Sequence, residues 1–237
     1  MIRISPIKLS SLYRIEKTTG KIDEWVPAPN APKMKGFCSG AAWRNTAEQD
    51  HYALNWLVAV GESELGQYIV SEEYSGSIHD IGKQLINSKD RLNIGYLFVE
   101  DSSDDNVAAL CSMEGLTFYG RHTTIHGEDR WVSPDNRFAY FRSRDTIVNI
   151  GSVSPEISGD LASGFEFLHH LRKTKRLAWR TDCAMTDWVF RQKAPFDNVL
   201  KHPLTKAVIY CIMSMVKMGT PTTNHAVSGS SYGNRRR

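Results

Sequence analysis

The sequence lacks any apolar run long enough to cross a membrane. A spanning helix needs about 20 consecutive apolar residues, whereas the longest apolar stretch, 207–216, is much shorter and lies between Lys206 and Lys217. The first residues also lack the apolar segment of a secretory signal. We therefore expect a soluble, cytoplasmic protein that makes no membrane contact.

Paired cysteines and glycine-rich nucleotide loops are also absent. Cys38, Cys111, Cys183 and Cys211 are far apart, and no C-x-x-C pair occurs. Zinc sites normally have ligands at such short spacings, so the pattern favours buried free thiols in a reducing compartment. The chain contains neither a GxxxxGK[ST] loop nor a GxGxxG loop after a strand. No ATP-binding or dinucleotide-binding domain is predicted.

The residues that are present predict one main folded domain. The hydrophobic fraction of 41% and the charged fraction of 23% are ordinary for a globular protein. Residues 1–35 are interpreted as an irregular lead-in and linker, because they contain a possible short strand pair and then a proline-rich stretch. Residues 36–218 form the predicted α/β domain. Residues 219–237 are rich in Gly, Ser and Arg and predict a flexible basic tail.

The hydrophobic pattern of the main domain predicts a mixed sheet with helices. From residue 37 the predicted order is strand, hairpin, helix, strand, helix, strand, and the apolar strands indicate a covered sheet. These elements are predicted at 37–43, 51–60, 67–74, 77–88, 94–100, 104–114 and 116–119. The second half predicts strands at 138–142 and 146–150 and helices at 160–177, 181–191 and 203–218.

Two adjacent acids, Glu100 and Asp101, follow the strongly apolar strand at 94–100. Catalytic groups gather at strand ends in α/β sheets, and paired carboxylates suit Mg²⁺ or Mn²⁺. The pair is therefore a candidate metal and catalytic site, to which Asp182 or Asp187 could add a further carboxylate. The alternative is that the acids of 101–105 cap the next helix and that Asp182 and Asp187 are surface or capping residues.

A basic cluster with one interleaved tryptophan makes nucleic acid a candidate partner. If residues 172–176 are helical, Arg172 and Arg176 share one face, and Trp179 follows where it could stack on a base. The alternative is a solvated helix face. The residues in this hypothesis are Arg172, Lys173, Lys175, Arg176, Trp179, Arg180, Arg235, Arg236 and Arg237. The overall charge of +3 neither requires nor excludes nucleic acid.

The segment from Gly36 to Gly120 resembles the nuclease domain of phage large terminases, a branch of the RNase H-like fold. The resemblance lies in the order of elements and in the stretches GAAWRNTAEQDHYALNWLVAVGESELGQYIVSEEYSG and IGYLFVEDSSDDNVAAL. It implies an RNase H-like mixed sheet and a metal-dependent nuclease that uses Mg²⁺ or Mn²⁺. In that family an aspartate on the first strand, an acid after the fourth strand and a late acid hold the metal ions.

Glu100 or Asp101 matches the second acid of this pattern, but the other two positions differ. Ala41 and Ala42 occupy the first position, and the late segment 201–207 contains no acid. Asp50 could replace the first acid, and Asp182 or Asp187 the last. The resemblance therefore implies a nucleic-acid-acting protein that shares the fold and has lost robust cleavage. The alternative hypothesis is a viral or phage structural protein that binds or coats nucleic acid within a homo-oligomer or virion assembly.

Overall fold

The computed structural model describes the central part of the chain and several shorter stretches. They are residues 13–15, 22–27, 32–43, 55–100, 117–119, 121–125, 128–132, 140–143, 146–191, 199–200 and 202–220. The predicted helix at 104–114 and most of the predicted tail at 219–237 lie outside these residues, as do most of the proline-rich stretch and the acids Asp50 and Asp101.

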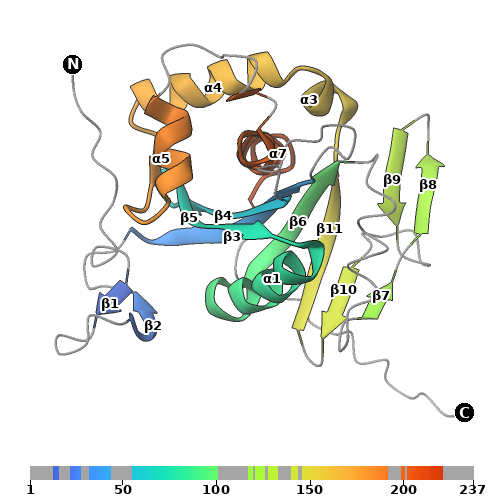
Figure 1. The fold of residues 1–237 in the computed structure, drawn as a ribbon, viewed down its shortest axis with the longest axis horizontal. Helices are drawn as coiled ribbons and strands as arrows, with labels where there is room; N and C mark the ends of the chain where they lie inside the picture. The colour runs from blue at the N-terminus through green and yellow to red at the C-terminus, as the bar shows by residue number, and fades with distance from the viewer. Residues whose placement is uncertain are drawn as a thin grey trace, which may run out of the picture.

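The described strands form one large sheet and two small strand pairs (Figure 1). The large sheet contains β3 (Met34–Ala42), β4 (Asn55–Ser63), β5 (Tyr68–Gly76), β6 (Ile94–Glu100), β7 (Thr117–Tyr119), β10 (Tyr140–Ser143), β11 (Thr146–Val153) and β12 (Leu177–Trp179). The small pairs are β1 (Tyr13–Ile15) with β2 (Ile22–Pro27), and β8 (Arg121–Ile125) with β9 (Glu128–Val132). The predicted α/β class with a mixed sheet is confirmed.

The strand order in the large sheet is β12-β5-β4-β3-β6-β11-β10-β7. Strands β3, β4 and β5 form an antiparallel meander, and β6 pairs parallel to β3 on its free side. Strand β11 then pairs parallel to β6. The prediction that the segments at 51–60 and 67–74 pair antiparallel, with 94–100 in the same sheet, is confirmed for the described residues.

The helices cover both faces of this sheet. Helix α1 (Ile78–Leu92) lies on one face, while α7 (Pro203–Met218) lies on the other (Figure 1). Helix α1 begins where predicted, because Ser77 and Asp80 form a capping box that satisfies free backbone N–H groups. Helices α3 (Pro155–Gly159), α4 (Leu161–Lys173) and α5 (Ala184–Arg191) pack around α7.

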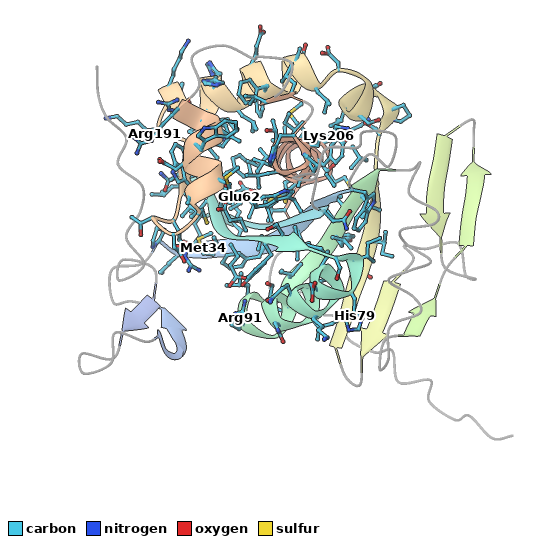
Figure 2. All side chains as sticks on the ribbon, viewed as in Figure 1. Met34, Glu62, His79, Arg91, Arg191 and Lys206 are labelled. Atoms are coloured by element: carbon cyan, nitrogen blue, oxygen red, sulfur yellow. The ribbon has the colours of Figure 1, made fainter. Side chains whose placement is uncertain are left out.

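Helix α7 is buried on most of its surface, including Leu204, Val208 and Tyr210. This matches its sequence, since a helix that is apolar on all sides is normally enclosed, and its side chains fill the space between the sheet and α4 (Figure 2). Cys38, Cys183 and Cys211 are free and buried, as predicted. Cys111 lies outside the described residues.

The predicted helix at 160–177 is too long. Helix α4 ends at Lys173, and Lys175 adopts a left-handed backbone with a φ of 61°. The chain then turns into β12, where Leu177 is buried beside β5. The charged residues at 172–176 do not indicate a turn in the sequence. The turn is required by the pairing of β12 with β5.

Candidate functional site

Strands β3, β6 and β11 run parallel and end at the same edge of the sheet. Gly40 of β3 pairs with Phe98 of β6, and Val153 at the end of β11 pairs with Glu100. Ala42 lies two residues after Gly40, as Glu100 lies two residues after Phe98, so both occupy this carboxyl edge. The predicted position of Glu100 at a strand end is therefore confirmed for its backbone, while its side chain is outside the described structure.

The first turn of α7 lies at the same edge. The ring of His202 lies 5.6 Å from the ring of Trp56, which pairs with Ala42 across β3 and β4. His202 also caps the helix, because its Nδ1 accepts a hydrogen bond from the backbone N–H of Leu204 at 3.2 Å. Lys206, in this first turn, is partly exposed. The first turn of α7 therefore brings no carboxylate to this edge.

Gly40 allows this close contact between α7 and β3. A Cβ atom at Gly40 would lie 2.2 Å from the carbonyl oxygen of Ala207 and 2.8 Å from the Cβ of Cys211. No side chain fits at these distances, so the missing Cβ sets how near α7 approaches the sheet. The position of the α7 N-terminus at the edge thus depends on this glycine.

The two late acids considered for a metal site are engaged elsewhere. Asp182 forms an ion pair with Arg180, and Asp187 accepts hydrogen bonds from the indole of Trp179 and from Arg191. Arg180 and Trp179 belong to the β12 side of the sheet, which β5, β4 and β3 separate from β6. At a strand spacing of about 4.8 Å, β12 and β6 are about 19 Å apart. The structure therefore gives neither acid a place beside Glu100.

The described residues do not fit a two-metal centre. Such a centre needs several carboxylates that hold ions about 4 Å apart. Ala42 offers no ligand atom at the edge, and the first turn of α7 contains no acid. In the described part of the chain, no three His, Cys, Asp or Glu residues are grouped so that they could hold a metal ion.

The predicted basic cluster is only partly a surface. The prediction that Arg172 and Arg176 share a helix face is wrong, because α4 ends between them. Arg172 donates a hydrogen bond to the carbonyl of Phe190 in α5, and Arg176 donates one to the carbonyl of Gly66 at 3.0 Å. Lys173, Lys175 and Arg176 are nevertheless exposed at this end of α4.

Trp179 and Arg180 are core residues in the structure. Trp179 is 3% exposed and stacks on Phe190, with ring centroids 5.3 Å apart. Arg180 is 6% exposed and paired with Asp182. Trp179 therefore offers no free ring face to a base, and the predicted stacking at this position is wrong. The cause is the pairing of β12 with β5, which draws both residues into the core. Arg235, Arg236 and Arg237 lie outside the described residues.

The aromatic side chain that sequence reasoning missed is Trp188. It is 43% exposed on α5, and its ring lies 6.3 Å from the ring of His202. The signal was in the helical spacing of α5, because Thr186, Val189 and Phe190 form its buried face. Burial lowers the pKa of His202, so the imidazole beside Trp188 is neutral at pH 7.

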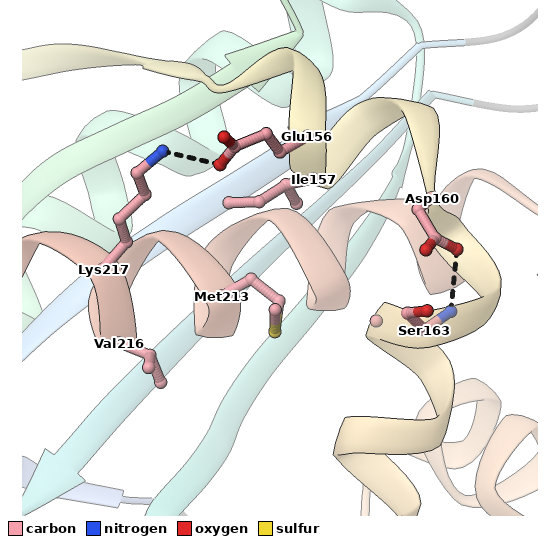
Figure 3. A pocket seen from close by; sticks show the side chains of 8 residues that line it. Glu156, Ile157, Asp160, Ser163, Met213, Val216 and Lys217 are labelled. Atoms are coloured by element: carbon pink, nitrogen blue, oxygen red, sulfur yellow. Dashed lines mark hydrogen bonds and ion pairs between the residues drawn. The ribbon is translucent and has the colours of Figure 1, made fainter.

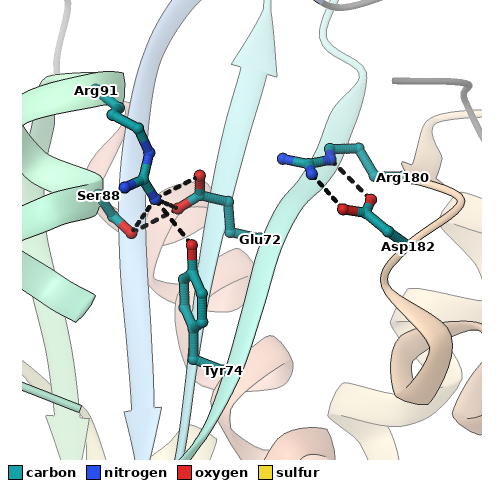
Figure 4. A network of polar contacts seen from close by, with 6 residues as sticks. All are labelled: Glu72, Tyr74, Ser88, Arg91, Arg180 and Asp182. Atoms are coloured by element: carbon teal, nitrogen blue, oxygen red, sulfur yellow. Dashed lines mark hydrogen bonds and ion pairs between the residues drawn. The ribbon is translucent and has the colours of Figure 1, made fainter. Parts of the chain in front are cut away.

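A buried polar network stabilises the opposite face of the sheet (Figure 4). Arg91 of α1 binds the carboxylate of Glu72 on β5 at 2.8 Å and the hydroxyl of Tyr74 at 2.8 Å. Ser88 donates to the same carboxylate at 2.5 Å. Only 3% of the Glu72 side chain is exposed. A fully paired buried carboxylate of this kind ties α1 to β5 and is not available to a ligand.

A pocket between α3, α4 and α7 lies on the α7 face (Figure 3). Its lining residues are Glu156, Ile157, Asp160, Ser163, Gly164, Met213, Val216 and Lys217. Both acids already have partners, since Glu156 pairs with Lys217 at 3.0 Å and Asp160 caps α4 through the N–H of Ser163. The pocket therefore presents an apolar floor with satisfied polar groups and no arrangement suited to catalysis.

Comparisons with known proteins found no family model, no curated protein and no solved structure that matches this chain. Among the described helices, none combines the length and the apolar character required to cross a membrane.

Proposed function

We propose that this protein binds nucleic acid through an RNase H-like core that does not cleave it. The observation that carries the proposal is the strand order β5-β4-β3-β6-β11, with β6 and β11 parallel to β3. An antiparallel meander extended by parallel strands beside its first strand is the arrangement that the resemblance to terminase nuclease domains implies. Helix α1 connects β5 to β6 and covers one face, in agreement with the same arrangement.

The residues at the carboxyl edge support binding without cleavage. In the nuclease pattern, the first strand and a late segment each supply an acid. Here Ala41 and Ala42 occupy the first position, and the segment 201–207 contains no acid. Losing carboxylates removes the ligands for two-metal catalysis. The N-terminus of α7 at this edge would instead attract a phosphate.

Exposed cations near the end of α4 support contact with a phosphate backbone. Lys173, Lys175 and Arg176 are exposed there, and Arg172 fixes this end of α4 to α5 through the carbonyl of Phe190. Lysines and arginines that neutralise phosphates release bound counterions, so such binding weakens as salt rises. It also depends little on base sequence.

Fluorescence anisotropy with labelled single-stranded and duplex DNA and RNA, measured across a salt series, tests the proposal. We expect the logarithm of the association constant to fall linearly with the logarithm of the salt concentration. Reversing Lys173 and Lys175 to Glu should weaken binding and reduce the slope by about 1 for each phosphate that the variant no longer neutralises. The control reverses Lys33 and Lys83, which are also exposed, and changes the net charge equally.

Cleavage is tested separately with plasmid DNA and Mn²⁺ or Mg²⁺. We expect no robust nicking, and Glu100→Ala should leave nucleic-acid binding intact. Nicking that disappears in Glu100→Ala would show that the site is an active metal-dependent nuclease. Absence of binding to all four ligands at low salt would refute the proposal itself. Large multi-protomer complexes on the nucleic acid would favour the structural, coating alternative.

A further inference from the structure

The turn between β4 and β5 presents a leucine almost entirely to solvent. Leu65 is 94% exposed, whereas Val216, the next most exposed large apolar side chain in the described part of the chain, is 47% exposed. A single exposed apolar residue is common on protein surfaces and carries little meaning by itself. Leu65 differs in its setting, because its loop is rigid and a basic turn packs against that loop.

Hydrogen bonds within the loop hold Leu65 in a fixed position. The backbone N–H of Gly66 donates to the carbonyl of Ser63 at 2.9 Å, and the N–H of Ser63 donates to the carbonyl of Gln67 at 2.8 Å. Gly66 has a φ of 72°, which glycine adopts without strain. The result is a common three-residue hairpin loop, and polar residues or glycine dominate such loops. The fold therefore does not require a leucine at this position.

The turn that joins α4 to β12 packs against this loop and supplies cations. The Nε of Arg176 donates a hydrogen bond to the carbonyl of Gly66 at 3.0 Å. The side-chain amide of Gln67 donates to the carbonyl of Lys175 at 3.2 Å. Lys175 and Arg176 are both exposed, and neither forms an ion pair within the described part of the chain. Both cations are therefore available to an anionic partner that covers Leu65.

The charge around Leu65 favours nucleic acid over a lipid surface. Glu64 is the acid of the same loop and is exposed, so Lys175 and Arg176 leave a net positive surface. A lipid surface would also attract these cations. However, even a complete acyl chain gives only marginal membrane binding, and one leucine buries much less apolar area. A polyanion that also offers apolar base surfaces fits the combination better.

An apolar side chain beside cations fits the minor groove of duplex DNA. That groove is about 6 Å wide, which admits a side chain from a narrow turn, while phosphates line both of its walls. Proteins that bind there often insert an apolar wedge such as leucine between two base pairs and kink the duplex. A wedge needs a rigid support, and the hydrogen-bonded loop provides one.

This surface lies at the edge of the sheet opposite Glu100. Met34, at the start of β3, pairs with Ser63, whereas Ala42 at the end of β3 lies at the carboxyl edge. The nine residues of β3 span roughly 26 Å at about 3.3 Å per residue. Contact at the loop therefore does not bring a duplex to Glu100, in agreement with binding without cleavage.

We propose that Leu65 inserts between two base pairs of duplex DNA from the minor groove, while Lys175 and Arg176 contact the flanking phosphates. The inference rests on the proposed function and adds to it the duplex form of the ligand and the residue that distorts it. Insertion is easiest where bases unstack readily, at a mismatched pair or a flexible pyrimidine–purine step. It requires no base-specific hydrogen bond.

The test compares Leu65→Asn and Leu65→Met in the full chain, with a labelled DNA duplex and the same duplex containing one mismatched pair. The parent chain should bind the mismatched duplex about fivefold more tightly, because unstacking there costs less. Leu65→Asn, which suits a turn, should lose that preference, and Leu65→Met should keep most of it. Val216→Ala, which shortens an exposed apolar side chain of α7, is the control and should behave as the parent chain does.

DNA bending gives a readout that a change in stability alone would not move. Dyes at the two ends of the duplex should come closer when the parent chain or Leu65→Met saturates it, and should keep their free separation with Leu65→Asn. Lys175→Glu should weaken binding to both duplexes alike and leave the mismatch preference intact, because phosphate contacts do not depend on base pairing.

An equal mismatch preference in Leu65→Asn and the parent chain would overturn the inference while the proposed function stands. Binding of single strands alone, or a saturated duplex that stays straight, would have the same consequence. Loss of binding to anionic lipid vesicles or of a dimer in Leu65→Asn, with DNA binding and bending unchanged, would also overturn it and assign Leu65 to that partner. If the parent chain binds no nucleic acid, both proposals fail.

Discussion

Gly40→Ala tests the contact that places α7 on the sheet. The added Cβ would lie 2.2 Å from the carbonyl oxygen of Ala207, whereas ordinary van der Waals contact begins at 3.4 Å. Helix α7 or strand β3 must therefore move by about 1 Å. The obstacle is a backbone atom in a buried helix, so no side-chain rotation relieves it.

The expected loss of stability follows from two opposing terms. Overpacking of a dense core costs about 3 kcal/mol at the upper end of its usual range. Replacing Gly by Ala restricts the unfolded chain and returns up to about 1 kcal/mol. We therefore expect a net loss of about 2 kcal/mol in the free energy of unfolding. For a chain of this length that corresponds to a decrease in Tm of about 4–8 °C.

Urea unfolding followed by fluorescence, together with thermal melts, measures this difference. Gly159→Ala in α3 is the matched control, because a Cβ atom there meets nothing within 4 Å. That variant should be about 0.5–1 kcal/mol more stable, since alanine is preferred to glycine in a helix. If Gly40→Ala proved as stable as the parent chain, α7 would not lie against β3 as described, and the position of its N-terminus would be wrong.

Two further predictions concern charge. Arg91→Ala should lower the free energy of unfolding in urea by about 3 kcal/mol, because it leaves the buried Glu72 carboxylate without its cation. The control Lys217→Ala, which breaks an exposed ion pair with Glu156, should lower it by less than about 1 kcal/mol. Equal losses in the two variants would contradict the buried network. Burial, assisted by Arg172 and Lys173, lowers the pKa of His169, so the unfolded chain binds the proton more readily and stability falls as pH drops below about 6.5. His169→Phe should reduce that fall between about pH 7 and pH 5 in urea titrations, and an unchanged pH dependence would show that other groups cause it.

The strands and helices that the hydrophobic pattern indicates could be predicted from the sequence. Strands β4, β5 and β6 are short apolar segments, and α1 begins at a capping box that the serine at 77 and the acid at 80 encode locally. Their pairing also followed, since two apolar strands joined by a short turn form a hairpin. These strands and the antiparallel β4–β5 hairpin were therefore predictable from residues close together in the chain.

The candidate site was predicted less well. The pattern correctly predicted Glu100 at a strand end. It wrongly predicted Trp179 and Arg180 at the surface, because the structure buries both. Their burial results from pairing with β5, more than a hundred residues earlier in the chain. Sequence spacing carries no information about such a pairing. Trp188, in contrast, lay on the exposed face of a helix whose buried residues repeat at helical spacing.

The sequence by itself determined the α/β class, the strand at 94–100 with its terminal acid, the apolar α7 and the absence of paired cysteines. These depend on local composition and periodicity, which act over a few residues. Tertiary structure alone decided that α7 approaches β3 at Gly40, that the N-terminus of α7 lies at the same edge as Ala42, and that Trp188, not Trp179, faces solvent. Packing between distant segments fixes these positions, because each depends on which surfaces exclude water together.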